Sequence, residues 1–326
     1  MKVAVTGASG FVGNCLCRDL KEVGATCKVL FHQYEDKLDD LGVEIVEGNI
    51  LDRFALEKLV DNVDVVFHLA AKISLQKKDN KSVRESIVTG TRNVIEASRQ
   101  KGVKRLIHFS TIHALKWESA NEPVDESNPL KLSGMIAYET AKAEAEILVQ
   151  RASFSGLHTI MLNPTAIIGP CDYRLSDLTK ALLKIYQRKL PVLVTGGYDF
   201  VDVRDVSHAA INAMSMGRSG ERYILSGKWL SLKELATVIR EVTGHKTTQN
   251  TIPISLARLG LPFVNAWSFV SGKPQLYSAE SLEILKTSNR NISNLKAQRE
   301  LGFRSRPIEE TVRDTFAWLE QNNFLS

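Results

Sequence analysis

Short apolar runs alternate with longer amphipathic stretches through the first half of the chain. The apolar runs are rich in valine, isoleucine, leucine and phenylalanine and are short enough to be buried strands. The longer stretches repeat their apolar positions with helical spacing. This alternation is typical of β-α-β units, in which helices cover both faces of a parallel sheet. The predicted strands lie at 2–5, 27–31, 43–46, 63–68, 105–109 and 158–162, and the predicted helices at 11–23, 54–60, 82–100 and 137–153.

The pattern becomes irregular after Pro164. Shorter helical patterns then mix with strand fragments and turn residues, which indicates a smaller lobe with its own core. We therefore expect an α/β fold: a doubly wound parallel sheet of the Rossmann type with a smaller mixed C-terminal lobe. The expected domains are 1–164, with a returning element near 200–225, and 165–326. The C-terminal helical patterns lie at 177–187, 205–216, 232–242 and 309–320.

Composition narrows the functional classes. Hydrophobic residues make up 44% of the chain and charged residues 24%, which is ordinary for a globular protein. The net charge of +5 comes from 42 basic and 37 acidic residues scattered without blocks. It indicates weak attraction for anions and no nucleic-acid partner. No apolar run reaches the roughly 18 residues of a membrane span, and a buried-type strand from residue 2 leaves no room for a signal peptide. We expect a cytoplasmic protein without a membrane partner.

The four cysteines, Cys15, Cys17, Cys27 and Cys171, lack the spacing of a metal site. Cysteines of a cytoplasmic protein are expected to be free thiols. We therefore predict no metal site in this chain.

Three glycines, Gly7, Gly10 and Gly13, stand between the first predicted strand and the first predicted helix. Glycine allows a tight turn and a close approach of the backbone to a pyrophosphate. The helix N-terminus adds unpaired N–H groups and a favourable dipole. Because the glycines follow an N-terminal strand directly, they predict that the first domain binds a dinucleotide cofactor. The second lobe is then expected to bind mainly substrate.

Tyr138 and Lys142 are four residues apart in a predicted helix. Residues at this spacing share a helix face, so a phenol and an ammonium can reach one small volume. A neighbouring cation favours phenolate and lowers the tyrosine pKa toward the working pH, where proton exchange with a substrate oxygen becomes efficient. With the glycine-rich turn, the pair indicates a nucleotide-dependent oxidoreductase.

The glycine spacing followed by Tyr-x-x-x-Lys resembles the extended short-chain dehydrogenase/reductase family, whose members include epimerases and dehydratases. Within it, the chain looks most like the branch of dihydroflavonol reductases and 3β-hydroxysteroid dehydrogenases. The resemblance covers nearly the whole chain. The further matching segments are Gly48-Asn49-Ile50-Leu51-Asp52, His68-Leu69-Ala70-Ala71, Asn163-Pro164-Thr165 with Gly169-Pro170, and Phe200 to Val206.

The resemblance implies roles for three catalytic residues. Thr111 would hold the substrate oxygen, with Ser110 as the neighbouring alternative. Tyr138 would donate a proton, and Lys142 would hydrogen-bond the nicotinamide ribose and keep the tyrosine pKa low. A match in the Val-Asp-Val-Arg-Asp-Val segment is interpreted as a structural hinge between the lobes.

The cofactor is expected to be NADP, with NAD as the alternative. The stretch after the second strand has no acidic residue until Glu35, whereas Lys28 and His32 are basic. An acid at that place would accept from the ribose hydroxyls of NAD and repel a 2′-phosphate. The resulting cofactor-binding set is Thr6, Gly7, Ser9, Gly10, Phe11, Val12, Gly13, Lys28, His32, Asn49, Ile50, Leu69, Ala70, Ala71, Tyr138, Lys142, Asn163, Pro164 and Thr165.

Two positions depart from the family pattern. Ile87 stands where the family has an asparagine, and isoleucine cannot make the polar contacts of an amide. Asn49 stands where the family has an aspartate, but its amide oxygen can still accept from the adenine amino group.

The predicted reaction is reduction of a ketone or aldehyde, or the reverse oxidation, on a hydrophobic or aromatic small molecule. Ile112 and His113 follow Thr111, which argues against the acid and base that sugar dehydratases carry there. His113 is a candidate polar group on the substrate side, against the alternative of a solvated loop residue. The candidate pocket aromatics are Tyr173, Tyr198, Phe200, Trp229, Phe263 and Trp267.

Two alternatives remain open. A nucleotide-sugar epimerase would use Tyr138 with tightly held NAD, and Arg174, Arg204 and Arg222 would then meet the diphosphate. A non-catalytic cofactor sensor or scaffold on the same fold is the second, with Ile87 as its main support. A homodimer through the helices at 82–100 and 137–153 is expected by analogy with the family.

Overall fold

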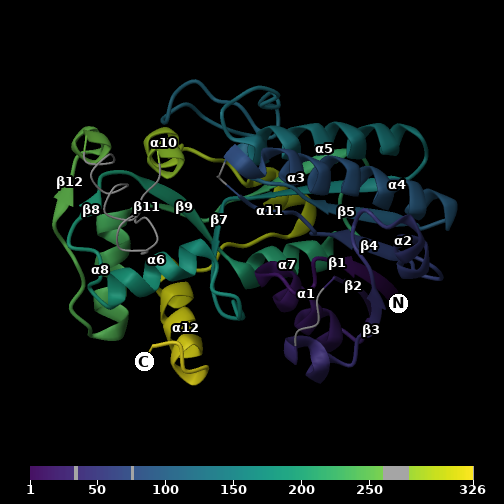
Figure 1. The fold of residues 1–326 in the computed structure, drawn as a ribbon, viewed down its shortest axis with the longest axis horizontal. Coiled ribbons are helices and arrows are strands. Elements are labelled where there is room, and N and C mark those ends of the chain that lie inside the picture. The colour runs from purple at the N-terminus through teal and green to yellow at the C-terminus, as the bar shows by residue number, and fades with distance from the viewer. Residues whose placement is uncertain (33–35, 75–76, 260–278, 326) are drawn as a thin grey trace.

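A parallel sheet of seven strands forms the centre of the molecule, in the order β10-β6-β5-β4-β1-β2-β3 (Figure 1). The computed structural model describes residues 1–32, 36–74, 77–259 and 279–325. The strands are β1 (Lys2–Thr6), β2 (Thr26–Phe31), β3 (Glu44–Glu47), β4 (Val65–His68), β5 (Arg105–Phe109), β6 (His158–Pro164) and β10 (Glu221–Leu225). The six strands expected from the sequence therefore form, and residues 221–225 add the seventh after the chain has built much of the second lobe.

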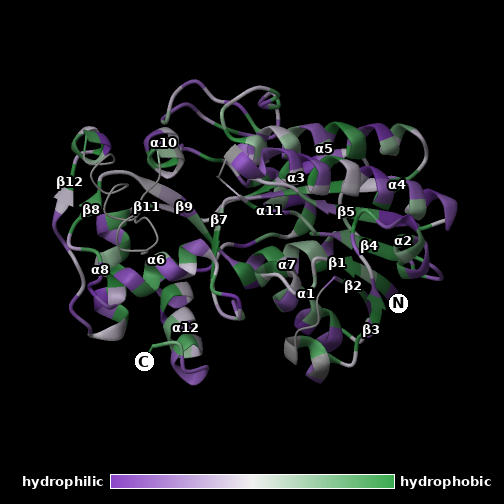
Figure 2. Cartoon of the chain, viewed as in Figure 1, coloured by the Kyte–Doolittle hydropathy of each residue, from purple (hydrophilic) through white to green (hydrophobic). Residues whose placement is uncertain are grey.

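Helices cover both faces of this sheet, as the doubly wound prediction requires. Alternate residues of β1 separate the two cores: Val3 and Val5 pack with α1 and α7, and Ala4 packs with α2, α4 and α5. Figure 2 shows the central strands as largely hydrophobic and the helices as amphipathic. The helices around the sheet are α1 (Phe11–Glu22), α2 (Arg53–Leu59), α3 (Asn80–Arg84), α4 (Gly90–Gln100), α5 (Ala137–Phe154), α7 (Val203–Asn212) and α11 (Leu295–Leu301).

The smaller lobe has a separate hydrophobic core and mixed strands. β9 pairs in parallel with β7 and antiparallel with β11, and β8 pairs in parallel with β12. The mixed C-terminal lobe is thus confirmed. Its strands are β7 (Ala166–Ile168), β8 (Leu193–Val194), β9 (Gly197–Asp202), β11 (Lys228–Ser231) and β12 (Thr251–Ile252), and its helices are α6 (Asp177–Tyr186), α8 (Leu232–Thr243), α10 (Ala279–Thr287) and α12 (Ile308–Gln321).

The helix predicted over 82–100 is not regular. A π-helical turn at Glu85–Thr89 separates α3 from α4, and it carries Ile87 on its buried side. Such turns occur frequently at functional sites. The hydrophobic pattern did not predict this turn, because one widened turn leaves the apolar spacing of the flanking helices almost unchanged.

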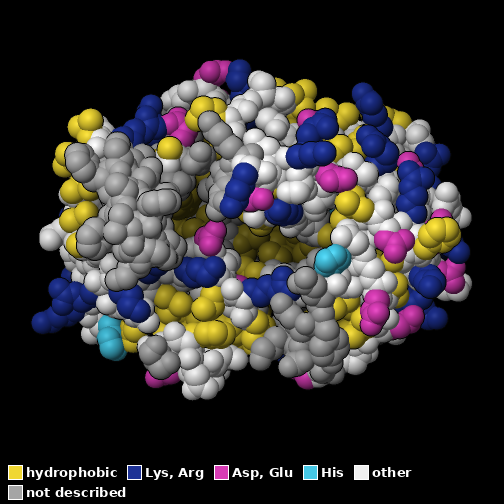
Figure 3. Space-filling model, viewed as in Figure 1, with side chains coloured by type: hydrophobic (Ala, Val, Ile, Leu, Met, Phe, Trp, Pro, Cys, Tyr) yellow, Lys and Arg dark blue, Asp and Glu magenta, His cyan; other side chains and the backbone are white. Residues whose placement is uncertain are grey.

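Figure 3 shows the molecule hollowed at the centre of one face, with apolar side chains in the depth of the hollow and lysine and arginine side chains around it. An apolar depression with a basic rim suits an anionic ligand that has aromatic parts. Separately, none of the helices described in residues 1–32, 36–74, 77–259 and 279–325 is long and apolar enough to cross a membrane.

Candidate active site

The glycine cradle, consisting of Gly7, Gly10 and Gly13, connects β1 to α1 as the sequence predicted. Gly7 has a φ of +79°, and a Cβ there would lie 2.8 Å from the Ala70 amide nitrogen. A Cβ on Gly13 would lie 2.1 Å from the Gly7 carbonyl oxygen. A larger residue at Gly7 would push the turn away from the chain after β4, and one at Gly13 would push α1 away from the turn. The cradle therefore brings the start of α1 against the end of β4.

The first turn of α1 suits a pyrophosphate. Gly10 caps the helix without a side-chain hydrogen bond, and the first turn contains no acidic residue. The helix thus presents its first N–H groups and the positive end of its dipole without a competing carboxylate. Ser9, Phe11 and Val12 lie partly exposed around this turn.

The buried His68 side chain holds the end of β4 in place. Its Nδ1 lies 2.8 Å from Thr6 Oγ1 and its Nε2 lies 2.9 Å from Thr91 Oγ1. The Leu69 and Ala70 amides donate to the carbonyl and the hydroxyl oxygen of Thr6, respectively. Burial, together with the Lys142 charge, lowers the pKa of His68 to about 3, so the ring is neutral. These contacts fix the backbone beside the cradle, although the sequence analysis gave Thr91 no role.

The two basic residues expected near the cofactor lie in different places. The Lys28 ammonium donates to the carbonyls of Lys58 and Asp61 and pairs with Glu44 at 3.2 Å. Those carbonyls lie at the C-terminal end of α2, at the opposite edge of the sheet from the cradle. The structure therefore does not bring Lys28 to the cradle. Lys28 is the third residue of β2, away from the end of the strand that lies at the cradle.

His32 is exposed and directly follows β2, at the same sheet edge as the cradle. Glu35, the first acid after β2, lies outside the described residues. His32 is thus the one of the two expected basic residues that lies at the same sheet edge as the cradle.

Asn49 and Ile50 follow β3 at the same edge. The Asn49 Oδ1 accepts from the Leu51 N–H at 3.0 Å and closes a local turn. Ile50 is buried, and a Cβ on Gly90 would lie 2.8 Å from its Cγ1. The glycine at the start of α4 is therefore required by the close approach of Ile50.

Thr111 and Ser110 follow β5 and are both buried. The Thr111 hydroxyl accepts from the His113 N–H at 3.3 Å, which leaves its own proton able to serve another oxygen. The Ser110 hydroxyl instead donates to the Glu146 carboxylate. These contacts favour Thr111 over Ser110 as the residue that holds a substrate oxygen.

Tyr138 and Lys142 lie four residues apart on α5, which contacts the short turn η4 (Ile112–Ala114) directly after Thr111. Tyr138 and Ala71 both pack against the buried cluster that contains Ile87 and Ala141. Ala71 continues the strand end that borders the cradle. The structure therefore gathers the predicted catalytic residues and the cradle at the carboxyl edge of the sheet.

The electrostatics of the pair differ from the expectation. Removal from water and, to a smaller extent, the adjacent Glu139 carboxylate raise the pKa of Tyr138 to about 12. The Lys142 ammonium donates to the Phe109 carbonyl at 2.6 Å, and its burial lowers its pKa to about 8 although Glu146 acts in the opposite direction. The expected lowering of the Tyr138 pKa by Lys142 is thus not seen. Burial outweighs it, and the phenol is protonated at neutral pH.

A buried charge cluster behind Lys142 was missed by the sequence analysis. Glu146, one turn beyond Lys142 on α5, accepts from Ser110 and from the Asn163 amide at 2.6 Å, and it pairs with Arg222 at 3.2 Å. The Asn163 amide also donates to the Thr111 carbonyl at 3.0 Å. The continued four-residue spacing from Tyr138 through Lys142 to Glu146 was the available signal.

The Asn163-Pro164-Thr165 segment is buried and largely engaged in structure. Pro164 pairs with Leu225 of β10, and the Thr165 hydroxyl donates to the Leu225 carbonyl at 3.4 Å. The segment therefore anchors the last strand to the catalytic edge.

A second missed cluster lies on the other side of Tyr138. The buried Glu139 carboxylate lies 2.6 Å from the Lys131 ammonium and 3.7 Å from His113 Nδ1. Burial lowers the pKa of His113, with Glu139 opposing the shift. A pocket of about 350 Å³ opens here, the His113 pocket. Its lining comprises His113, Leu115, Lys116, Trp117, Lys131, Met135, Ile136, Glu139, Glu283, Ile284 and Thr287.

The aromatic residues proposed for a pocket are not gathered in one. The ring centroids of Tyr198 and Phe200 are 5.9 Å apart, and Phe200 is a core residue. Tyr173 packs edge-on against Trp318, whereas Trp229 lies beneath Arg290. Phe263 and Trp267 lie outside the described residues.

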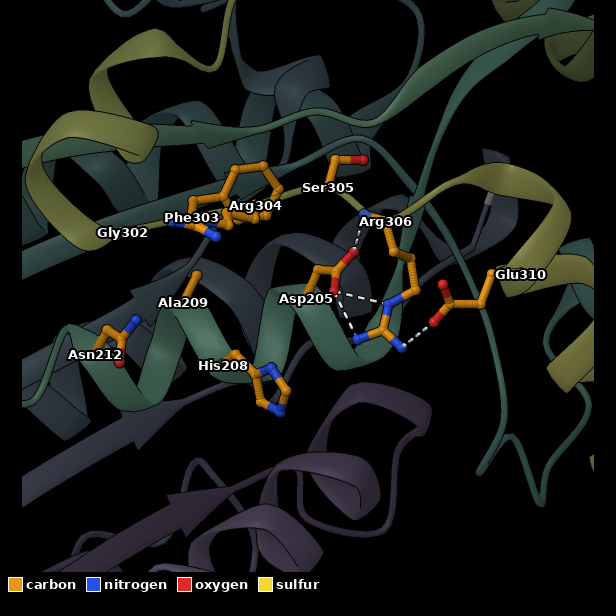
Figure 4. Close-up of a pocket in the computed structure, with 10 residues that line it drawn as sticks. All are labelled: Asp205, His208, Ala209, Asn212, Gly302, Phe303, Arg304, Ser305, Arg306 and Glu310. Atoms are coloured by element: carbon orange, nitrogen blue, oxygen red, sulfur yellow. Dashed lines mark hydrogen bonds and ion pairs between the residues drawn. The ribbon is translucent and has the colours of Figure 1, made fainter.

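The Val-Asp-Val-Arg-Asp-Val segment makes contacts between elements. Asp202 caps α7, Arg204 pairs with Asp202 and with Asp314 of α12, and Asp205 accepts from Arg306 (Figure 4). The pocket drawn in Figure 4, about 470 Å³, is lined by α7, residues 302–306 and Glu310, and by none of the predicted site residues. These ion pairs support a structural role. Because Arg204 and Arg222 are engaged by carboxylates, they are poorly placed to meet a diphosphate.

Metal chemistry has no visible site. Among the residues that the structure describes, no cluster of three or more histidine, cysteine, aspartate or glutamate side chains could hold a metal ion.

Comparison with known proteins agrees with the geometry. A model of the NAD dependent epimerase/dehydratase family matches residues 3–226. The chain is 28% identical over 330 residues to sterol demethylase protein B of Methylococcus capsulatus, with 100% of each chain covered. It is 31% identical over 300 residues to 2-alkyl-3-oxoalkanoate reductase of Stenotrophomonas maltophilia, covering 86% of this chain and 89% of the reductase. The crystal structure of gox2253 is similar with a TM-score of 0.85 and 29% identity, covering 99% of both chains.

The Rossmann sheet, the glycine cradle and these relatives define an NAD(P)-dependent enzyme of the extended short-chain dehydrogenase/reductase type. The chain belongs to the NAD dependent epimerase/dehydratase family. Other relatives are named as a dihydroflavonol reductase, a ketoreductase and a 3β-hydroxysteroid-dehydrogenase/decarboxylase, which confirms the branch inferred from the motifs.

Proposed function

We propose that this enzyme reduces a ketone or aldehyde on a hydrophobic small molecule with NADPH, and that Tyr138 is the general acid. The observation that carries the proposal is the place of Tyr138 on α5, which contacts the turn after Thr111 and carries Glu139 of the His113 pocket lining. With a pKa of about 12 the phenol carries its proton at neutral pH, as a general acid must. Names of relatives such as 2-alkyl-3-oxoalkanoate reductase support a carbonyl attached to an apolar chain.

The cradle fits the phosphates of a dinucleotide, because its backbone is open and the first turn of α1 lacks a carboxylate. Gly7, Gly10, Gly13, Leu69 and Ala70 would hold these phosphates. When bound, the nicotinamide supplies the hydride. His32 at the end of β2 supports the preference for NADP, since a basic residue there favours a 2′-phosphate. Lys28 is left out of this proposal.

Three side chains perform the remaining steps. Thr111 donates a hydrogen bond to the substrate oxygen and stabilises the charge that develops there. Tyr138 transfers its proton to that oxygen. Lys142, fixed to the Phe109 carbonyl, would keep a cationic donor near the phenol and bond the nicotinamide ribose.

The His113 pocket is the expected substrate-binding site. Leu115, Ile136 and Ile284 provide apolar walls, and His113 provides a neutral polar group. The charged groups of the lining are paired: Lys131 with Glu139 inside the lining, and Lys116 and Glu283 with Glu118 and Arg258 outside it. A neutral, mainly hydrophobic molecule with one or two oxygen atoms is therefore the expected substrate class.

Fluorescence titration with NADPH and NADH, followed by assays on apolar carbonyl compounds, tests the proposal. We expect tighter and reversible NADPH binding and oxidation of NADPH by at least one substrate class. Tyr138→Phe should lose about a thousandfold or more in turnover and keep cofactor affinity, since only the proton donor is removed. Tyr186→Phe, in the C-terminal lobe against Phe316, is the matched control and should leave both unchanged.

Two outcomes would favour other activities. NAD released only by denaturation, with turnover of nucleotide sugars and no net redox change, would replace the reductase by an epimerase. Intact NADPH binding without turnover of any carbonyl compound would favour a cofactor sensor or scaffold.

A further inference from the structure

Cys15 and Cys171 meet across the boundary between the two lobes. Cys15 lies in the second turn of α1, directly after the cradle, and is buried. Cys171 follows β7 in the Gly169-Pro170 loop and is partly exposed. A hydrogen bond between the two thiols shifts the pKa of each, and the Cys15 thiol also donates to the Asp19 carboxylate at 3.9 Å. A second contact joins the same segments, because the Arg18 guanidinium of α1 lies 5.4 Å from the centre of the Tyr173 ring.

The loop holds Cys171 in this place firmly. The next residue, Asp172, is fully buried and accepts from the Ser176 N–H at 2.8 Å and from the Thr179 hydroxyl at 2.6 Å. Cys171 itself has a φ of +72°. A left-handed conformation is uncommon for residues other than glycine and asparagine, and it persists where the surroundings impose it. The backbone that carries Cys171 is thus held in one conformation by the loop.

The two thiols differ in reactivity. The hydrogen bond from Cys15 and the nearby Arg18 and Arg204 charges lower the pKa of Cys171 against the effect of its burial. The same hydrogen bond, together with burial, raises the pKa of Cys15. A partly exposed thiol with a lowered pKa beside cations is the kind that reacts with oxidants. Cys171 is therefore the attacking sulfur and Cys15 the resolving one.

We propose that Cys15 and Cys171 form a redox-modification site, which hydrogen peroxide converts to a disulfide that ties α1 to the loop after β7. The Cys171 thiolate attacks one peroxide oxygen, the O–O bond breaks, and a sulfenic acid and hydroxide form. The Cys15 sulfur then attacks the sulfenic sulfur and its S–O bond breaks. The sum is two thiols and one H₂O₂ giving one disulfide and two water molecules, with two electrons passing from sulfur to peroxide.

The disulfide would act on cofactor binding. An S–S bond of about 2.05 Å is shorter than a hydrogen bond between thiols, so α1 and the loop must move closer when it forms. α1 carries the cradle at its start, and the Gly169-Pro170 loop resembles the segment that borders the nicotinamide. We expect the oxidised protein to bind NADPH or NADH about tenfold more weakly. The site does not depend on the reductase reaction proposed above.

Peptide mapping of the peroxide-treated full chain tests the site directly. Reduced protein is treated with stoichiometric H₂O₂, blocked with N-ethylmaleimide and digested with trypsin without reductant. Trypsin places Cys15 in peptide 3–18 and Cys171 in peptide 152–174. We expect these two peptides linked, separated again by dithiothreitol. Since peptide 3–18 also contains Cys17, the experiment is repeated with Cys17→Ala, which should keep the link.

Variants supply the outcomes that would overturn the proposal. Cys171→Ser and Cys15→Ala should both lose the linked peptide and bind cofactor equally before and after peroxide. A second substitution at each position guards against a variant that fails to fold, and circular dichroism checks that each variant is folded. A wild-type map without this link, or peroxide-weakened cofactor binding that persists in folded Cys171→Ser, would refute the site. Failure of reductase turnover would leave the mapping result unaffected.

Discussion

The Lys142 ammonium lies 2.6 Å from the Phe109 carbonyl oxygen and so joins the catalytic helix to the end of β5. Thr111 follows that carbonyl by two residues, and Tyr138 lies one turn before Lys142 on α5. This hydrogen bond sets the position of the lysine without making it a direct partner of the phenol. The protonated Tyr138 and the positioned Lys142 are consistent with a general acid beside a fixed cation, rather than with a preformed phenolate.

Replacing Glu146 by glutamine should destabilise the protein strongly. Glu146 is 1% exposed and balances Arg222 while accepting from Ser110 and Asn163. Glu146→Gln leaves the Arg222 charge without its carboxylate, and breaking a buried pair costs about 3 kcal/mol or more. Urea unfolding measures the loss.

The control for this variant is Glu144→Gln, two residues away on α5. Its carboxylate pairs with Arg84 at 2.5 Å, but the Arg84 side chain is 62% exposed. An exposed pair contributes about 1 kcal/mol or less, so this variant should unfold close to wild type. Equal losses of unfolding free energy in both variants would mean that the buried cluster stabilises the protein no more than the exposed ion pair does.

His68 should make the protein sensitive to mild acid. Its pKa is about 3 in the folded protein, against 6.5 for an unperturbed imidazole. Below pH 6.5 the unfolded chain takes up a proton that the folded chain excludes, so stability falls as the pH decreases from about 6.5 to about 3. The full shift corresponds to about 5 kcal/mol.

His68→Gln isolates this effect, because an amide can still bond both threonines but does not titrate in that range. The difference between wild type and variant in unfolding free energy should change between pH 7 and pH 4. A pH-independent difference for His68→Gln would contradict the assigned burial effect.

The sequence predicted those features that rest on repeating patterns or on steric necessity. The strand periodicity located six of the seven central strands, because buried parallel strands leave continuous apolar runs. Gly7 and Gly13 were placed at the cradle from spacing alone, and the close contacts with Ala70 and the Gly7 carbonyl show why glycine is required.

Features that depend on which end of an element a side chain faces were not predictable. Lys28 belongs to β2 as expected, but its ammonium extends to the carbonyls after α2. Glu139 and Glu146 read as ordinary helix-surface residues until α5 is packed against the sheet, where both become buried. Burial also reverses the expected direction of the Tyr138 pKa shift, and burial is a property of the tertiary structure.

Gly13→Ala should disrupt the cradle. The new Cβ would lie 2.1 Å from the Gly7 carbonyl oxygen, a backbone atom that cannot rotate away. α1 must therefore shift from the turn, and we expect cofactor affinity to fall by about tenfold or more, with a lower melting temperature.

Gly134→Ala is the matched control for the cradle variant. Its nearest neighbour would be the flexible end of Lys131 at 3.3 Å, and Gly134 is exposed. Cofactor affinity and melting temperature should both stay near the wild-type values. Unchanged cofactor binding in Gly13→Ala would argue against the cradle as the phosphate site.

Ile87→Asn restores the amide of the family pattern, yet we expect it to harm this protein. Ile87 is 1% exposed in the π-helical turn, and its cluster consists of Val83, Val88, Ala141 and Ala145, with Tyr138 at the edge. An amide placed among these apolar side chains without a partner costs about 2 kcal/mol or more, and displaced packing would reach Tyr138. The melting temperature and the turnover rate should both decrease. Ile87→Val should lower the free energy of unfolding by only about 1 kcal/mol and keep turnover. A stable Ile87→Asn enzyme with faster turnover would instead show that the π-helical turn retains polar partners for the family amide, and that isoleucine slows the reaction here.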